Sequence, residues 1–158
     1  MYFILKKLSA FATWMGPRGW RLWGGGFGTL LWWFLPKKRR LIMLENLMIS
    51  LQIDEKRARQ LAKVNCQNMG VLIMEALALP KLTPVDVSQW ISIEGKEHLE
   101  EALAMNRGVI IATAHQGNWE WLGGGLALYG YPLVAVMTPQ HNKEVNQIIM
   151  DLRGGANM

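Results

Sequence analysis

The stretch "GVIIATAHQGNWEWLGGG", residues 108–125, changes its pattern halfway and predicts the fold of the second half of the chain. Residues 108–114 are a continuous run of mostly apolar and β-branched residues, which is typical of a strand covered on both faces. The following "NWEWLGGGLALYG" predicts a helix with glycines in its middle, and "YPLVAVMT" at 131–138 predicts a second buried strand. Strand, helix and strand at this spacing indicate a βαβ unit with a parallel sheet.

Upstream of this unit the sequence predicts helices. Residues 37–51 place apolar side chains at helical spacing, and Asp54 is a candidate N-cap for a second helix. The second helix is expected to end before Pro80, because proline cannot continue a helix. The apolar side chains that this helix is expected to turn inward are Leu61, Val64, Leu72 and Leu79.

Three further elements complete the prediction. Residues 90–95 alternate like a half-buried strand, residues 96–105 predict a short helix, and an amphipathic helix is expected from Asn142 to Arg153. The expected fold class is therefore α/β, with N-terminal membrane-associating helices followed by a partial parallel-sheet βαβ core.

A histidine and a glutamate flank the turn between the first predicted strand and its helix. His115 follows the strand and Glu120 falls in the first turn of the helix, and open α/β sheets bind ligands beyond the carboxyl ends of their strands. The loop between them can fold back so that the carboxylate meets one imidazole nitrogen. A histidine oriented in this way takes a proton from a hydroxyl at neutral pH, because the carboxylate fixes the tautomer and stabilises the imidazolium.

This His-x4-acid spacing has two explanations. His98 and His141 have no acid at the same offset, and the Gly117-Asn118 turn stands between strand and helix, which favours a functional pair. The alternative is a histidine at a strand end that a helix carboxylate holds for stability alone. No Ser or Cys lies in a nucleophile elbow nearby, so the simplest chemistry is direct attack by a substrate hydroxyl on an activated carbonyl.

Every charge in the first 44 residues is basic, and tryptophans lie among these charges. Tryptophan beside Lys or Arg at the edge of an apolar stretch is the pattern of a membrane interface, and no basic-aromatic nucleic-acid motif is present. We therefore expect membrane lipids and no nucleic acid as partners, with a tryptophan core cluster as the alternative. The cations are Lys6, Lys7, Arg18, Arg21, Lys37, Lys38, Arg39 and Arg40, and the tryptophans are Trp14, Trp20, Trp23, Trp32 and Trp33.

The apolar run from Leu22 to Leu35 is shorter than the roughly 20 residues that span a bilayer. It predicts an anchored or re-entrant segment, with the Lys37 to Arg40 cluster on the cytoplasmic side. The expected organisation is a membrane anchor or interfacial segment at 1–36 and one further domain at 37–158. Cys66 is the only cysteine, which excludes an internal disulfide and a cysteine metal cluster.

The segment "GVIIATAHQGNWEWLGGGLALYGYPLVAVMTPQHN", residues 108–142, resembles the signature region of the bacterial lipid A late acyltransferases. These lauroyl and myristoyl transferases belong to the lysophospholipid acyltransferase superfamily. The segment "KKRRLIMLENLMISL", residues 37–51, resembles the basic segment that follows the membrane anchor of the family. The resemblance runs from about residue 20 to residue 153, and HQGNWE is its most specific part.

The resemblance implies a membrane-bound enzyme on the cytoplasmic face of the bacterial inner membrane. It would pass a fatty acyl group from an acyl carrier protein, or another acyl thioester, to a hydroxyl of a glycolipid such as a lipid A precursor, without a cofactor or a metal. The sheet would then be a partial acyltransferase core. The residues at the matching positions are His115 as general base, Glu120 as its orienting partner, and Gly117, Asn118, Trp119, Asn142 and Arg153 as substrate-binding residues.

Within this set, Gly117, Asn118 and Trp119 would shape the turn, and Asn142 and Arg153 would help to place a phosphate or the donor. The alternative explanations for the last two are an N-cap and a solvated cation at a helix end.

Members of the family are considerably longer, and their later blocks are absent here, which predicts an N-terminal part or a truncated product. Alternative functions are acylation of a phospholipid or a mannosylated phosphoinositide, a non-catalytic membrane-bound fragment or pseudoenzyme, and a hydrolase in which His115 activates water.

Overall fold

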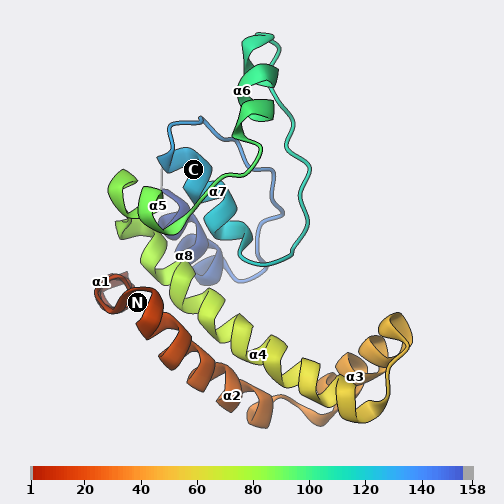
Figure 1. The fold of residues 1–158 in the computed structure, drawn as a ribbon. Coiled ribbons are helices and arrows are strands. Elements are labelled where there is room, and N and C mark those ends of the chain that lie inside the picture. The colour runs from red at the N-terminus through yellow and green to blue at the C-terminus, as the bar shows by residue number, and fades with distance from the viewer. Residues whose placement is uncertain (1, 155–158) are drawn as a thin grey trace. The chain divides into compact units, whose positions relative to one another are not determined.

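The computed structural model describes residues 2–154 and divides the chain into two compact units. Unit 1 comprises residues 1–80 and unit 2 residues 81–158. All the regular elements within the described residues are helices, and extended loops connect several of those in unit 2 (Figure 1).

Unit 1 consists of helices joined by short connections, and three of its segments pack along one long helix (Figure 1). That long helix is α4, and the segments are α1, η1 and α2. In chain order the elements are α1 (Tyr2–Gly19), the π-helix η1 (Trp20–Gly24), α2 (Gly25–Phe34), α3 (Lys37–Leu51), α4 (Glu55–Ala78) and the 3₁₀ turn η2 (Leu79–Lys81), whose last residue belongs to unit 2.

Glycines bring α2 and α4 into backbone contact. A side chain at Gly28 would collide with the backbone of Cys66, and a side chain at Gly70 would collide with the backbone of Gly24. A Cβ at Gly24 would lie 2.7 Å from the Cα atom of Val71. Small residues at four-residue spacing let helices approach closely, and they maximise van der Waals contact. The buried face of α4 follows this spacing and contains Ala58, Ala62, Cys66, Gly70 and Ala78.

This face differs from the one that the sequence predicts. Val64 is 49% exposed, and Leu61 and Leu72 are only partly buried, so the prediction of an apolar inward face was wrong except at Leu79, which is buried. The reason is that the line of closest approach is formed by small side chains. Large side chains at those positions would push the helices apart.

The boundaries predicted for the helices of unit 1 are confirmed. Helix α3 spans Lys37–Leu51, and the Asp54 side chain caps α4 by accepting a hydrogen bond of 2.7 Å from the backbone N–H of Arg57. Helix α4 ends at Ala78, before Pro80. The local rules on which these predictions rest, hydrophobic spacing and capping, act within one helix and need no distant partner.

The tryptophans of unit 1 divide into two groups. Trp20 and Trp32 are 2% and 3% exposed, and the Trp20 indole donates a hydrogen bond to the carbonyl of Ala12. Trp14, Trp23 and Trp33 are exposed. The core cluster therefore accounts for Trp20 and Trp32, and the membrane interface stays a prediction for the three exposed tryptophans.

Helix α1 is interrupted at Gly16, whose positive φ of 63° is accessible to glycine and is followed by Pro17.

Unit 2 contains four α-helices among its described residues. Three of them match the helices predicted after residue 95, which confirms those predictions within one or two residues. In chain order the four are α5 (Pro84–Trp90), α6 (Lys96–Ala104), α7 (Trp119–Leu128) and α8 (Lys143–Gly154).

The predicted α/β class, with its partial parallel-sheet βαβ core, is wrong for this structure. Residues 108–114 and 131–138 form irregular, extended loops, and no backbone hydrogen bond joins them within the described part of the chain. The strand predicted at 90–95 is replaced by the end of α5 and an irregular segment. The expectation of an α/β acyltransferase core is thereby overturned at the level of the fold.

The physical reason is that a strand depends on a neighbour for its backbone hydrogen bonds, whereas a helix supplies its own. Composition predicts that a segment suits a sheet, but it does not supply the partner. In unit 2 several apolar side chains of these segments are uncovered, and Ile110, Val134 and Val136 are 97%, 92% and 101% exposed.

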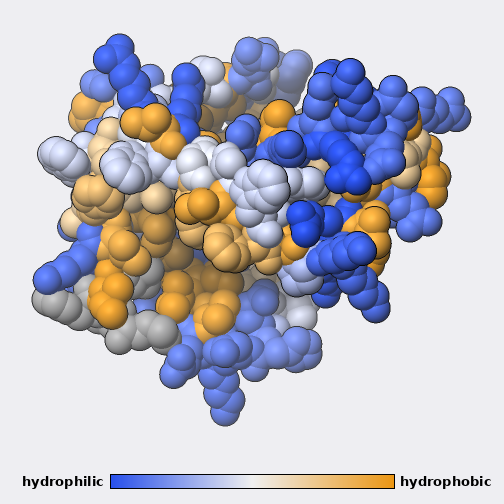
Figure 2. All heavy atoms as spheres, turned by 90° about the horizontal axis from the view of Figure 1, so that it is seen from below, coloured by the Kyte–Doolittle hydropathy of each residue, from blue (hydrophilic) through white to orange (hydrophobic). Residues whose placement is uncertain are grey.

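Exposed apolar side chains also occur outside these segments, and orange apolar groups interrupt the blue polar ones on the face seen in Figure 2. Within residues 2–154, no helix combines the length and the apolar character that crossing a bilayer requires.

Candidate functional site

The turn before α7 carries the predicted site residues. Gln116 donates its backbone N–H to the carbonyl of Ala114 at 2.8 Å, and Gly117 follows with a φ of 61°, which favours glycine. Asn118 then caps α7, since its side-chain oxygen accepts the backbone N–H of Trp121 at 3.1 Å. Gly117 and Asn118 therefore shape the turn, and their role in substrate binding stays a prediction.

Glu120 lies in the first turn of α7 and binds Arg153, in α8, through a two-pronged ion pair. The Arg153 Nε atom donates to Oε2 at 2.9 Å and Nη2 donates to Oε1 at 2.7 Å. The two side chains are only 19% and 18% exposed. Hydrogen bonding to Glu120 raises the pKa of Arg153 above its ordinary value, although burial opposes this. The pair fixes α8 against α7, because a fork of two charge-assisted bonds defines both distance and orientation.

Trp119 lies between Glu120 and His115. Its indole N–H donates to the Oε1 atom of Glu120 at 3.2 Å, and its ring lies 4.8 Å from the His115 ring, centroid to centroid, at an interplanar angle of 47°. Trp119 thus contacts both members of the predicted pair.

His115 itself is exposed. Within the described residues its ring contacts Trp119, and no hydrogen bond joins it to Glu120. The structure therefore brings Glu120 to Arg153 and Trp119 instead of placing it directly on the imidazole. The catalytic roles of His115 and Glu120 stay predictions.

Asn142 and Arg153 occupy different settings from each other. Asn142 caps α8, accepting the backbone N–H groups of Glu144 at 2.9 Å and Val145 at 3.1 Å, which agrees with its alternative explanation as an N-cap. Arg153 is not a solvated cation, because it pairs with Glu120 and its Nη1 atom also contacts the sulfur of Met137 at 2.8 Å.

Sequence reasoning singled out Glu120 and Arg153 but did not pair them. The only signal for the pair is opposite charge near the ends of two predicted helices, and many other pairs share that signal.

Two contacts that sequence reasoning missed hold α7 within unit 2. The Tyr129 hydroxyl donates to the carbonyl of Ile91 at 2.7 Å, and Trp121 stacks on Trp90 with ring centroids 6.4 Å apart. Neither contact has a local sequence signature, because each joins residues about thirty or more positions apart.

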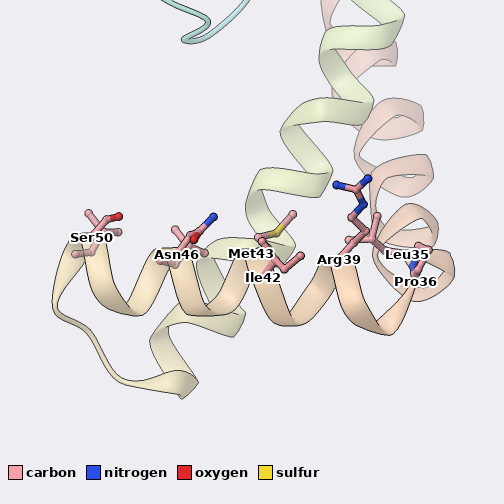
Figure 3. Close-up of a pocket in the computed structure, with 9 residues that line it drawn as sticks. Leu35, Pro36, Arg39, Ile42, Met43, Asn46 and Ser50 are labelled. Atoms are coloured by element: carbon pink, nitrogen blue, oxygen red, sulfur yellow. The ribbon is translucent and has the colours of Figure 1, made fainter.

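A groove of about 820 Å³ lies along α3 in unit 1, and none of the predicted site residues lines it (Figure 3). Its lining residues are Leu35, Pro36, Arg39, Ile42, Met43, Asn46, Leu47, Ser50 and Leu51. Within residues 2–154, no group of three or more His, Cys, Asp or Glu side chains is arranged to hold a metal ion.

Comparison with known proteins adds an independent observation. The family described as "Bacterial lipid A biosynthesis acyltransferase" matches residues 5–158. The chain is 26% identical over 148 residues to the lipid A biosynthesis palmitoleoyltransferase of Escherichia coli (strain K12), covering 80% of this chain and 48% of that protein. A lipid A biosynthesis acyltransferase of Shigella flexneri is similar to the same extent. The chain spans about half the length of these relatives, and no solved structure matches it.

Proposed function

We propose an activity for this chain, which belongs to the bacterial lipid A biosynthesis acyltransferase family. The proposed activity is the transfer of a fatty acyl group to a hydroxyl of a glycolipid such as a lipid A precursor. The proposed donor is an acyl thioester carried by acyl carrier protein. The observation that carries the proposal is the exposed His115 in the turn before α7, inside the matched region, with its ring against Trp119, whose indole binds Glu120.

His115 acts as the general base in this proposal. Its imidazole takes the proton of the acceptor hydroxyl, whose oxygen attacks the thioester carbonyl. A C–O bond forms, the C–S bond breaks, and the imidazolium returns its proton to the departing thiolate. An exposed histidine suits this role, because a substrate hydroxyl must reach within hydrogen-bond distance of the ring nitrogen.

Glu120 supports His115 in this proposal, and Gly117, Asn118 and Trp119 form the turn that places the imidazole. Asn142 and Arg153 contribute by fixing α8, as a cap and as the partner of Glu120.

The proposed location is the cytoplasmic face of the bacterial inner membrane. The cations Lys37, Lys38 and Arg39 are exposed, and the aromatic side chains Trp33 and Phe34 next to them are 65% and 81% exposed. The amphipathic indole of Trp33 beside these cations suits a boundary with anionic headgroups.

The test is an acyl-transfer assay of the full chain in anionic phospholipid vesicles, with acyl carrier protein thioester as donor and a lipid A precursor as acceptor. His115→Ala should lower transfer by about 100-fold or more, because general base catalysis is lost. The matched control is His98→Ala, an exposed histidine in α6, which should transfer at the wild-type rate.

Equal transfer by wild type and His115→Ala would contradict the proposed role of His115. Acylation of a lysophospholipid or a mannosylated phosphoinositide in place of the lipid A precursor would replace the proposed acceptor. Release of free fatty acid without transfer would favour a hydrolase, and no turnover at all would identify a non-catalytic chain. Replacing the cations at 37–40 by serine should release the chain from the vesicles on sedimentation, and unchanged binding would contradict the proposed membrane surface.

A further inference from the structure

We propose that a small cavity between α2 and α4 in unit 1 binds a phosphate group, and that Lys63 is the cation that pairs with it. The cavity has a volume of about 170 Å³, and its lining residues are Thr29, Trp32, Trp33, Lys63 and Gln67. It contains none of the residues to which the proposed acyl transfer assigns a role, so the inference stands apart from the proposed function.

The antiparallel register of the helices explains why an indole and a lysine meet at this cavity. A Cβ at Gly24 would lie against Val71 and one at Gly28 against Cys66, so the residue number rises along one helix as it falls along the other. One further turn in the same register leads to Trp32 on α2 and to Lys63 on α4, and both line the cavity.

A hydrogen bond between the two helices supports one wall of the cavity. The Gln67 Nε2 atom donates to the Thr29 hydroxyl at 3.0 Å, and this hydroxyl donates to the carbonyl of Gly25 at 2.9 Å. A side-chain amide has two N–H donors, and within the described residues Gln67 uses one of them. The second N–H of Gln67 is therefore available to a ligand in the cavity.

Lys63 is a cation without a counter-ion in the described part of the chain. Arg59, one turn earlier on α4, pairs with Glu55, whereas no acidic residue lies three or four positions from Lys63 in either direction. The lining of the cavity contains no acidic residue either. An ammonium group that has no acidic neighbour favours an anionic ligand.

Arg40 brings a second positive charge close to the cavity. Its guanidinium carbon lies 5.7 Å from the centroid of the Trp32 ring, and Trp32 is itself a buried wall of the cavity. A phosphate group matches this surrounding, because it combines negative charge with several acceptor oxygens for the Lys63 and Gln67 donors.

A phosphate group can reach the cavity from two sources, the headgroup of a phospholipid and dissolved phosphate. Trp33 lines the cavity and is 65% exposed, and an exposed indole is typical of the headgroup level of a membrane. A phospholipid would place its phosphate in the cavity and leave its acyl chains outside. The two sources share the same contacts with Lys63, so the experiment has to separate them.

The experiment is an NMR titration of the full chain in a maltoside detergent, which contains no phosphate. Dihexanoyl phosphatidylglycerol is added at constant ionic strength, and the ¹H–¹⁵N signals of the Gln67 side-chain amide, identified with Gln67→Leu, report binding. These signals should shift and reach saturation. Lys63→Gln should raise the Kd by about 10-fold or more, because a charge-assisted hydrogen bond to the phosphate is lost.

Lys56→Gln is the matched control for Lys63→Gln. Lys56 is an exposed lysine of the same helix that does not line the cavity, so its substitution changes the net charge equally. The Kd of this variant should equal that of the wild type. Lys63 is also exposed, so neither substitution should disturb the fold, and unchanged backbone amide signals of α4 would show this.

Two further titrations identify the source of the phosphate. Inorganic phosphate that binds at least about 10-fold more weakly than the lipid, yet at Lys63, would identify the headgroup as the ligand. Equal Kd values for the two, both raised by Lys63→Gln, would identify dissolved phosphate. Dihexanoylglycerol, which lacks the phosphate, should leave the Gln67 signals unmoved.

Three outcomes would overturn the proposal. One is the same Kd for Lys63→Gln and Lys56→Gln, which would mean attraction by net charge alone. Another is a saturable shift with dihexanoylglycerol, which would mean that the cavity takes the apolar part of the lipid. The third is the absence of a saturable shift with both the phospholipid and inorganic phosphate.

Discussion

In unit 1 the helices are held by close contact between backbones, whereas in unit 2 they are held by a few side chains that meet over long sequence distances. Helix α2 meets α4 where Gly28 and Gly70 leave no room for a side chain. In unit 2, α7 is held by the ion pair of Glu120 with Arg153 and by the hydrogen bond from Tyr129 to Ile91. The place of α2 against α4 thus depends on the absence of side chains at two glycines, and the place of α7 in unit 2 depends on the presence of particular side chains.

This difference determines what each unit tolerates. A backbone contact spreads over many atoms and has no single partner to remove, but it cannot accept an added methyl group. An ion pair or a hydrogen bond fails when one partner is removed, because the other is left partly buried without compensation. The two units should therefore respond to opposite kinds of substitution.

The largest expected effect is that of Gly28→Ala in unit 1. Its new Cβ would collide with the backbone around Cys66, which cannot move aside as a flexible side chain can. We expect a loss of about 3 kcal/mol in the free energy of unfolding of unit 1, the upper range for overpacking. Urea denaturation, with hydrogen exchange of α2 and α4 amides read by mass spectrometry, measures this loss and shows whether unit 2 is spared.

Gly26→Ala is the matched control in the same helix. A Cβ at Gly26 would meet nothing within 4 Å, so the substitution should stabilise α2 by about 0.5–1 kcal/mol, because alanine loses less backbone entropy than glycine. If both alanine variants behave alike, the close contact of α2 with α4 does not hold unit 1 together.

The same contrast explains why the sequence predicts unit 1 better than unit 2. The bounds of α3 and the Asp54 cap follow from patterns within one helix, which a single sequence contains. The buried face of α4 could not be predicted in this way, because glycine and alanine do not mark a face as hydrophobic in the sequence. Their role depends on the helix that they contact. The predicted sheet failed for a related reason, because residues 108–114 suit a strand only where another strand accepts their hydrogen bonds.

The local features of the candidate site were predictable from the sequence, but its contacts were not. His115, Asn118 and Glu120 could be identified because turn chemistry, capping and the position of a carboxylate in the first turn are local features. The partner of Glu120 could not be identified from the sequence, because a carboxylate binds whichever hydrogen-bond donor the fold places near it. Here that donor is Arg153, from a helix that begins 23 residues after Glu120.

A smaller effect is expected for Arg153→Gln, which removes the ion pair of unit 2. We expect a loss of about 2 kcal/mol in the stability of unit 2, because Glu120 would keep its largely buried position without its guanidinium. Because Glu120 raises the pKa of Arg153, the ion pair contributes fully to the stability of unit 2 at any pH below the ordinary pKa of arginine. This contribution is lost only when the pH rises above that pKa. The loss should therefore be the same from pH 6 to pH 9, as measured by hydrogen exchange of α7 and α8 amides.

Arg59→Gln is the control, since it removes an equivalent charge from unit 1. Arg59 pairs with Glu55 within α4, but the two side chains are 53% and 59% exposed, so the change should cost less than about 0.5 kcal/mol. Equal losses for Arg59→Gln and Arg153→Gln would show that specific side-chain contacts matter no more in unit 2 than in unit 1.

The smallest effect concerns the start of α5, where Thr83 and Asp86 form a reciprocal cap. The Oδ2 atom of Asp86 accepts the backbone N–H of Thr83 at 2.9 Å and its hydroxyl at 2.7 Å, and these bonds lower the pKa of Asp86. Because folding lowers the pKa of Asp86, its hydrogen bonds stabilise α5 fully when the pH is above the ordinary pKa of aspartate. This stabilisation is lost as the pH falls through the pKa of Asp86 in the folded protein.

Asp86→Asn should therefore cost less than about 1 kcal/mol at pH 7, because the site is exposed and the amide still accepts hydrogen bonds. The difference from wild type should shrink as the pH falls through the ordinary pKa of aspartate, about 3.9, and should vanish below the lowered pKa of the folded protein, where wild-type Asp86 is protonated as well. Hydrogen exchange of α5 amides, corrected for the intrinsic effect of pH, measures this difference. The contact of Gly28 with α4 involves backbone atoms that acid does not titrate, so the deficit of Gly28→Ala should persist over the same range. If the stability lost in Asp86→Asn does not change with pH, α5 is held by packing, as α2 is held against α4. The contrast between the two units would then not apply to the ends of their helices.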